Sequence, residues 1–218
     1  MPSVAIIGLS SFGYYLCKYL SHSNVEVMAI DVNREKIEDV KDFIRNAVIA
    51  DARDRDVLAR LAVNEFDTVV ISVGDQIDTS ILVTLYLREL GVKNIIAKAI
   101  TEDHAKILHL MKVSTIVFPE RDIAHRFARI LQNNRLLDFY AIDKEYSVIE
   151  IAAPEIWIGK SLQELDIRRK YNVQIIMIHE VLPEKKMILP SAQHIIKDSD
   201  TMTILGQNKD LDQISKLR

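Results

Sequence analysis

The chain has 218 residues, of which 49% are hydrophobic and 27% charged, and its formal net charge at pH 7 is −3. This composition is typical of a globular chain with one large or two small domains, and the lack of a basic excess argues against nucleic-acid binding. The single cysteine, Cys17, cannot form an intrachain disulfide and suits a reducing compartment. We expect no signal peptide before Val4, and no apolar run approaches the roughly 18 residues of a membrane span, so a cytoplasmic protein is predicted.

Short β-branched runs alternate with helical patterns through the first half of the chain. The runs expected to form strands are Val4–Ile7, Val25–Ile30, Ala47–Ala50, Thr68–Ser72, Asn94–Ala97 and Thr115–Phe118. Helical spacing follows several of them, as at Tyr14–Leu20, Arg55–Leu61 and Ile77–Leu90. This alternation predicts βαβ units, and therefore an α/β fold with a Rossmann-like parallel sheet that helices cover on both faces. Right-handed crossovers would then place a ligand at the carboxyl ends of the strands.

The turn after the first run reads Gly8-Leu9-Ser10-Ser11-Phe12-Gly13, which is a dinucleotide-binding glycine pattern with one position altered. Gly8 would make the tight turn, and Gly13 would let the next helix pack closely while its N-terminus faces the phosphates. Ser10 replaces the middle glycine, where the backbone comes closest to the pyrophosphate. Either its hydroxyl bonds to a phosphate, or its side chain pushes the ligand away. The alternative to a nucleotide site is a Rossmann-like domain whose pocket has degenerated.

An acid, Asp31, ends the second run at the distance that the dinucleotide pattern requires. In this position a carboxylate accepts hydrogen bonds from a ribose diol and disfavours a 2′-phosphate, so NADP is the least expected nucleotide. Acids, small residues and one lysine follow the other runs at the same sheet edge. The residues predicted to form the site are Gly8, Ser10, Ser11, Phe12, Gly13, Asp31, Val32, Asn33, Asp51, Ala52, Ser72, Val73, Gly74 and Lys98. Helix capping or solvation is the alternative role for Asp51, and a solvated charge is the alternative for Lys98.

The second half begins with a further helix, which opens at Pro119 and runs to about Asn133. Its apolar face, which we predict packs on a second copy of the chain, consists of Ile123, Phe127, Ile130 and Leu131. The strands expected after it are Phe139–Ile142, Tyr146–Ile151, Val173–His179, Lys186–Leu189 and Met202–Leu205. These runs have little helix between them and predict a small α+β domain with a mostly antiparallel sheet. The predicted domains are therefore residues 1–135 and 136–218.

Two sets of motifs run through the chain in a fixed order. The first half contains Ile6-Ile7-Gly8, Phe12-Gly13, Asp31 followed by Asn33, Val73-Gly74-Asp75, Lys98-Ala99 and Pro119-Glu120-Arg121-Asp122. The second half contains Gly159-Lys160-Ser161-Leu162, Leu165-Asp166-Ile167-Arg168, Tyr171-Asn172-Val173, Pro190-Ser191, Asp200 and Ile204-Leu205-Gly206. Together they resemble the regulator-of-potassium-conductance (RCK) family, with its N-terminal domain followed by its C-terminal domain, over essentially the whole chain.

This resemblance implies a regulatory subunit and not an enzyme. Family members of the TrkA and KtrA kind are cytoplasmic subunits of bacterial potassium uptake systems, held at the inner face of the cell membrane by a membrane potassium-translocating partner. They form dimers and then rings, such as octamers or tetramers of dimers, whose shape changes when NAD(H), ADP or ATP binds. Glu120 matches a family glutamate near the phosphates that can hold a divalent cation; the alternative is an acid that complements the helix dipole. Ser11 departs from an arginine that in Ktr-like members reaches a phosphate in the neighbouring subunit.

The resemblance also implies a second ligand, cyclic di-AMP, in the C-terminal domain. Its contacts would fall at Arg168, Gln174, Ile175 and Pro190. The runner-up function is an NAD-dependent oxidoreductase, which would share the glycine pattern. However, none of the six histidines forms a recognisable catalytic pair with a lysine, tyrosine or carboxylate at diagnostic spacing. The sequence therefore predicts a nucleotide sensor without catalytic residues.

Overall fold

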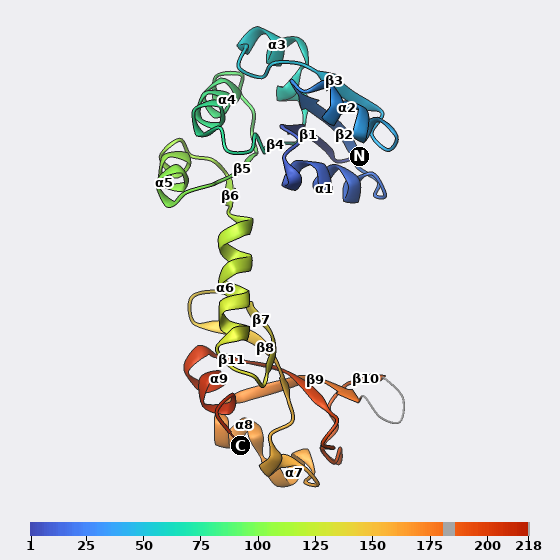
Figure 1. Cartoon of the computed structure of the whole chain (residues 1–218), viewed down its shortest axis with the longest axis vertical. Coiled ribbons are helices and arrows are strands. Elements are labelled where there is room, and N and C mark those ends of the chain that lie inside the picture. The colour runs from blue at the N-terminus through green and yellow to red at the C-terminus, as the bar shows by residue number, and fades with distance from the viewer. Residues whose placement is uncertain (181–185, 218) are drawn as a thin grey trace. The chain divides into compact units, whose positions relative to one another are not determined.

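The structure is a computed structural model that describes residues 1–180 and 186–217. The chain divides into two compact units, Met1–Glu120 and Arg121–Arg218. Each unit has its own sheet (Figure 1). Each also buries its own apolar core. Helix α6 (Pro119–Leu131) begins in the first unit and lies mostly in the second.

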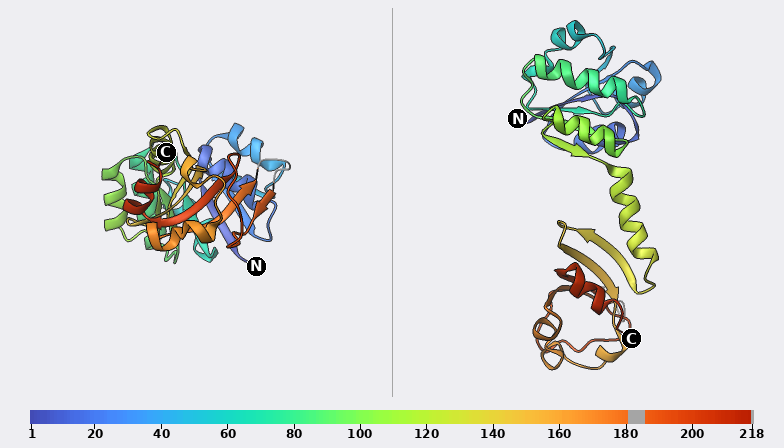
Figure 2. Two further views of the ribbon diagram at one scale, coloured as in Figure 1. Left: turned by 90° about the horizontal axis from the view of Figure 1, so that it is seen from below. Right: turned by 90° about the vertical axis from the view of Figure 1, so that its left-hand side faces the viewer.

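The N-terminal unit is a parallel sheet between two layers of helices (Figure 2). Its strands are β1 (Ser3–Ile7), β2 (Glu26–Asp31), β3 (Asn46–Ile49), β4 (Thr68–Ile71), β5 (Ile95–Lys98) and β6 (Thr115–Val117). Its helices are α1 (Ser11–Leu20), α2 (Arg34–Lys41), α3 (Arg55–Arg60), α4 (Ile77–Glu89) and α5 (Glu102–Leu110), with a 3-10 turn at Val63–Glu65. The strand order is β3-β2-β1-β4-β5-β6 and all neighbours are parallel, which is the Rossmann arrangement. The predicted α/β fold is confirmed.

The apolar runs at the centre of the sheet, β1, β2 and β4, are buried on both faces, because successive side chains of a strand point to opposite sides of the sheet. The edge strands β3 and β6 are half-buried or exposed. In β1, Ile7 belongs to the core on one face together with Leu108, whereas Ile6 belongs to the core on the other face with Cys17 and Ile37. Burial raises the pKa of the Cys17 thiol to about 12. This cysteine is therefore a small core residue and not a reactive group.

The C-terminal unit is built on an antiparallel sheet. Its strands are β7 (Leu136–Ala141), β8 (Tyr146–Ala152), β9 (Val173–Glu180), β10 (Lys186–Ile188) and β11 (Thr201–Gln207), in the order β10-β9-β11-β8-β7. The short helices are α7 (Leu162–Leu165), α8 (Ile167–Tyr171) and α9 (Asn208–Ile214), with a 3-10 turn at Glu155–Trp157. Trp157 is 1% exposed and is one of the largest side chains in this unit's core. The small α+β domain predicted from the sequence is confirmed.

The sequence pattern does not predict the short helices of this unit. Helices of one or two turns present too few apolar positions for a helical period to stand out. Local signals were present, however. Ser161 and Glu164 form a capping box at the start of α7, and Leu211 and Ile214 of α9 are buried three residues apart on one face.

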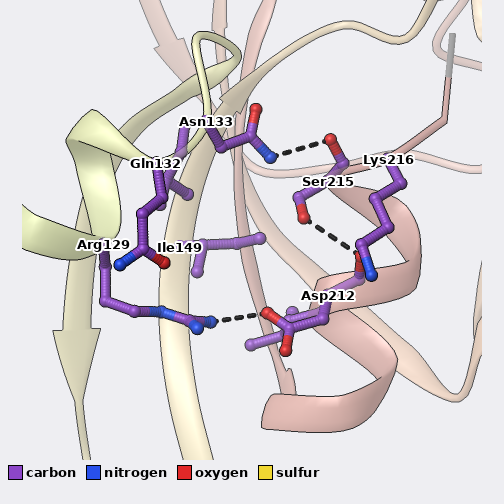
Figure 3. A pocket seen from close by; sticks show the side chains of 9 residues that line it. Arg129, Gln132, Asn133, Ile149, Asp212, Ser215 and Lys216 are labelled. Atoms are coloured by element: carbon purple, nitrogen blue, oxygen red, sulfur yellow. Dashed lines mark hydrogen bonds and ion pairs between the residues drawn. The ribbon is translucent and has the colours of Figure 1, made fainter.

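The last turns of α6 are anchored to the rest of the C-terminal unit. Arg126 forms two hydrogen bonds to the Asp138 carboxylate on β7, at 2.7 and 2.6 Å, and Arg129 pairs with Asp212 of α9 at 2.5 Å. The Asn133 side-chain amide donates to the Ser215 carbonyl at 2.9 Å. Figure 3 shows the Arg129–Asp212 and Asn133–Ser215 contacts beside a cavity of about 240 Å³. The end of α6 and the residues just after it are thus tied to β7 and to the α9 region.

Replacing Asp138 by asparagine is expected to lower the free energy of unfolding by about 1–2 kcal/mol at about pH 7. The Arg126 guanidinium holds the pKa of Asp138 below its ordinary value. A depressed pKa stabilises the fold above the unfolded-state value of about 3.9, and this stabilisation is lost as the pH falls through the lower folded-state value. Urea unfolding at several pH values should therefore show the difference between wild type and D138N shrinking toward the acid end. A difference that does not change with pH would contradict the ion-pair explanation.

Candidate functional site

The turn between β1 and α1 is closed against β4, and both of its glycines are required by packing. Gly8 has φ +90°, and a Cβ built on it would lie 2.5 Å from the Ser72 carbonyl oxygen. A Cβ on Gly13 would lie 2.2 Å from the Gly8 carbonyl oxygen. The first glycine therefore supplies a left-handed turn and a close approach to the neighbouring strand. The second lets α1 start directly over the turn, as the sequence predicts.

Ser10 is the N-cap residue of α1, and its side chain makes no capping hydrogen bond. The Gly13 N–H donates instead to the Ser72 hydroxyl, at 3.1 Å. The Ser10 and Ser72 hydroxyl oxygens lie 2.5 Å apart. The side chain that replaces the middle glycine is thus held by a second serine, which directly follows β4.

The Asp31 carboxylate holds the turn to the end of β2. It accepts the Leu9 N–H at 2.7 Å and the Asn33 N–H at 2.8 Å, one on each oxygen. Asp31 is 9% exposed, and the Lys36 ammonium lies 3.7 Å from its Oδ2. Each carboxylate oxygen has a further lone pair, so these contacts leave acceptor capacity for a ligand. Asp31 therefore has a structural role in addition to the predicted ribose role.

A cavity of about 290 Å³ opens at the carboxyl ends of β1 to β4. It is lined by Ile7, Gly8, Ile30, Asp31, Val32, Asn33, Lys36, Ala50, Asp51, Ala52, Arg53, Val73, Gln76 and Thr79. Seven of the residues predicted for the site belong to this lining, namely Gly8, Asp31, Val32, Asn33, Asp51, Ala52 and Val73. The lining also includes four polar residues that are not predicted from the sequence, because they lie beyond the ends of the strands: Lys36, Arg53, Gln76 and Thr79.

Asp51 does not cap the helix that follows it. Asp54 is the N-cap of α3 and accepts the N–H groups of Asp56 and Val57. Asp51 instead binds Arg53 through the Arg53 backbone N–H at 2.9 Å and the guanidinium at 2.8 Å. These bonds lower the pKa of Asp51, which keeps an ionised carboxylate at the rim of the cavity.

The remaining predicted residues lie outside the cavity lining. Ser10, Ser11, Phe12, Gly13 and Ser72 belong to or contact the adjoining turn, and Gly74 follows β4 with φ +69°. Lys98 ends β5, is 10% exposed at its side chain and pairs with Glu120 at 2.6 Å. This hydrogen bond lowers the pKa of Glu120. Lys98 is therefore paired with a carboxylate and is not a simple solvated charge.

The family-model comparison covers both halves of the chain: the TrkA-N domain model matches residues 4–119 and the TrkA-C domain model matches residues 147–218. The chain belongs to the TrkA-N and TrkA-C domain family. It is 38% identical over 212 residues to Ktr system potassium uptake protein C of Bacillus subtilis (strain 168), an alignment that covers 97% of this chain and 95% of that protein. It is 33% identical over 207 residues to Ktr system potassium uptake protein A of the same organism, an alignment that covers 95% of this chain and 92% of that protein.

Solved structures agree on the fold. The GsuK channel bound to NAD matches 99% of this chain with a TM-score of 0.70 at 18% identity, and the GsuK RCK domain matches the same share with a TM-score of 0.69. This chain spans 39% and 47% of the length of those chains. The RCK family predicted from the motifs is confirmed.

The TrkA-C half contains a second cavity, of about 200 Å³. Its lining consists of Leu162, Asp166, Ile167, Arg168, Val173, Gln174, Ile175 and Pro190. The four residues predicted to contact a second ligand, Arg168, Gln174, Ile175 and Pro190, all lie in this lining although Pro190 is distant from the others in the sequence. The cavity of Figure 3 is a different one, lined by Arg129, Gln132, Asn133, Leu136, Ile149, Leu211, Asp212, Ser215 and Lys216.

Several histidines have structural partners. The buried His104 contacts the Ser80 hydroxyl at 3.2 Å, and burial lowers its pKa, so it is a neutral group between α5 and α4. His179 contacts Thr203, and His194 contacts the buried Asp200 at 3.1 Å. Within residues 1–180 and 186–217, no three histidine, cysteine, aspartate or glutamate side chains are grouped as a metal site would need. No helix in the same ranges is long and apolar enough to cross a bilayer.

Proposed function

We propose that this protein is a nucleotide-binding regulatory subunit that controls potassium transport through a membrane partner. The observation that carries the proposal is the cavity at the ends of β1 to β4, bounded by the Gly8 turn and Asp31. It lies in a chain that aligns over 95–97% of its residues with two Ktr potassium uptake proteins. The ligand we infer is NAD(H), ADP or ATP, in the N-terminal domain of residues 1–135. Residues 136–218 form the second domain, for ligand binding and dimerisation.

A regulatory ligand works only through its preference for one conformation, because equal affinity for two ring shapes shifts neither. Typical coupling free energies are about 1–3 kcal/mol. The Lys98–Glu120 pair is well placed for such coupling, since Glu120 is the second residue of α6 and Lys98 ends a strand at the ligand edge. A divalent cation held by Glu120 together with a second copy of the chain belongs to the same proposal.

The nucleotide proposal is tested by calorimetry and thermal shift of the purified chain with NADH, NAD, ADP, ATP, AMP and cyclic di-AMP. At about 100 times its Kd, a ligand of the folded state stabilises by about 2.7 kcal/mol, which a melting curve resolves. At least one adenine nucleotide should do so, and failure of all of them would overturn the proposal. Robust oxidation of NADH with a panel of carbonyl substrates would favour the runner-up, an NAD-dependent oxidoreductase.

The potassium role is tested in vesicles that contain the membrane subunit of a Ktr system. Adding the purified chain should make potassium flux depend on the nucleotide that binds it. A flux that is the same with and without the chain would contradict a regulatory role. Binding to such a membrane subunit would hold this protein in the cytoplasm, at the inner face of the cell membrane.

Cyclic di-AMP is our proposed ligand for the C-terminal cavity. The supporting observation is that Arg168, Gln174, Ile175 and Pro190 converge on one hollow, with one guanidinium available to an anionic ligand. In the binding panel, heat of binding with cyclic di-AMP that persists when excess ADP is present would support two separate sites. Binding that ADP abolishes would contradict a C-terminal site.

We infer self-assembly into dimers and then rings from two exposed apolar faces. On α6, Phe127 is 55% and Leu131 is 79% exposed, and Ile123 is exposed beside them. A second face on α4 and α5 includes Leu85 and Leu110, both exposed. A closed ring built from dimers needs two different contact surfaces, and large exposed apolar side chains mark such surfaces.

Replacing Phe127 by glutamate is expected to convert dimers into single chains at micromolar concentration. A charge in the middle of the α6 face removes an apolar anchor and introduces an unpaired carboxylate into the interface. Light scattering after size-exclusion chromatography measures the mass. The control is Leu85→Glu, which should leave dimers intact and prevent only larger assemblies. A dimer that survives Phe127→Glu would contradict the role of α6.

A further inference from the structure

The hydroxyl of Ser10 is used in an unusual way for an N-cap serine. Such a side chain normally accepts an N–H from the first turn of its helix, but here the Gly13 N–H donates to Ser72. The cap of α1 therefore comes from the residue after β4. Ser10 is left to contact Ser72 alone, at the position where a dinucleotide site normally has bare backbone.

The direction of the Ser10–Ser72 hydrogen bond follows from counting protons. A serine hydroxyl has one proton to donate and two lone pairs that accept. Ser72 is 0% exposed, and one of its lone pairs accepts the Gly13 N–H. Among the hydrogen bonds of residues 1–180 and 186–217, the Ser10 oxygen is the acceptor that remains for the Ser72 proton. A buried proton without an acceptor is costly, so Ser72 donates to Ser10.

This direction leaves the Ser10 proton available to an outside acceptor. Ser10 is half-buried and lies at the first turn of α1, where the free N–H groups favour an anion. Gly8, two residues earlier, lines the cavity. The Gly13 N–H, which a glycine-rich turn would direct at a phosphate, is already bonded to Ser72. The turn therefore has a side-chain donor in addition to its remaining backbone donors.

We propose that Ser72 holds Ser10 as a hydroxyl donor to a phosphate oxygen of the bound nucleotide, so that the two serines set the preference for a phosphorylated ligand over its nucleoside. This inference rests on the proposed function. Ser10 would touch the ligand, whereas Ser72 is a positioning residue that acts through it. The side chain at the altered glycine position is then a ligand contact and not an obstruction.

The test compares ADP with adenosine, measured by calorimetry and by competition, on the full chain. Ser10→Ala should weaken ADP binding about tenfold, the usual effect of losing one hydrogen bond to a charged group, and leave adenosine binding unchanged. Ser72→Ala should weaken ADP binding by a similar factor, and the double variant should be no weaker than Ser10→Ala. Ser72→Thr, which keeps the hydroxyl, should restore most of the affinity.

Ser23→Ala is the matched control, because its hydroxyl donates to the Leu20 carbonyl beyond the far end of α1. It should change neither affinity. Ser10→Gly separates donation from obstruction: a glycine variant that binds ADP more tightly than wild type would overturn the proposal. An unchanged ADP affinity in a folded Ser10→Ala protein would overturn it too. If wild type binds none of NADH, NAD, ADP, ATP and AMP, the proposed function itself fails and the role proposed for Ser10 and Ser72 fails with it.

Discussion

Replacing Gly8 by alanine is expected to lower the free energy of unfolding of the N-terminal unit by about 2–5 kcal/mol. A left-handed backbone costs a residue with a Cβ about 1–2 kcal/mol, and Gly8 has φ +90°. The new methyl group would also lie 2.5 Å from the Ser72 carbonyl oxygen and 2.8 Å from the Val73 Cα. These are backbone atoms that cannot rotate away, so overpacking adds about 1–3 kcal/mol. Nucleotide binding should be lost with the turn.

Two other glycines separate these contributions. Gly91 has φ +80° and open space around its Cβ position, so Gly91→Ala should cost only the backbone strain of about 1–2 kcal/mol. Gly13 has no left-handed φ, but its Cβ would lie 2.2 Å from the Gly8 carbonyl oxygen, so Gly13→Ala measures the clash. Urea unfolding followed by circular dichroism, with hydrogen exchange of the β1 amides, gives the free energies. If Gly8→Ala were no more destabilised than Gly91→Ala, the close packing of the turn on β4 would be refuted.

The sheet and the glycine turn could be predicted because their signals are local. The central parallel strands are buried on both faces, so they appear as short apolar runs, and a run followed by glycine or an acid marks a strand end. Asp31 is predicted as a site residue for that reason. Its hydrogen bonds to the Leu9 and Asn33 N–H groups cannot be predicted from the sequence, because they depend on the path of the backbone around the turn.

The residues missed at the cavity lie where the chain has already left the strand. Lys36 and Thr79 belong to the first turns of α2 and α4, and Gln76 precedes α4. Whether such side chains reach a cavity depends on how each helix is inclined to the sheet, which periodicity does not encode. Ser72 was predicted for the site, yet its capping of Gly13 joins residues 59 positions apart, a contact that only the β1–β4 pairing creates.

Replacing Asp31 by asparagine is expected to change stability and ligand preference together, and a comparison of two ligands separates the roles. The amide oxygen can accept only one of the N–H groups of Leu9 and Asn33, and the amide nitrogen would face the other, so unfolding should become easier by about 1–3 kcal/mol. Asp67 provides a matched control. Its carboxylate also accepts a backbone N–H, from Ser3 at 2.8 Å, and it does not line the cavity.

The decisive measurement is the affinity ratio between ADP and 2′-deoxy-ADP, because general damage to the turn weakens both ligands equally. If Asp31 binds the ribose diol, wild type should prefer ADP about tenfold, the effect of a hydrogen bond to a charged group. Asp31→Asn should reduce that ratio to within about threefold, and Asp67→Asn should leave it unchanged. An undiminished ratio in a destabilised Asp31→Asn protein would mean that the carboxylate only ties the Gly8 turn to β2. The ribose would then have to be held by another polar side chain of the lining. Asn33 and Asp51 are the candidates, because each has a side-chain oxygen that can accept a hydrogen bond.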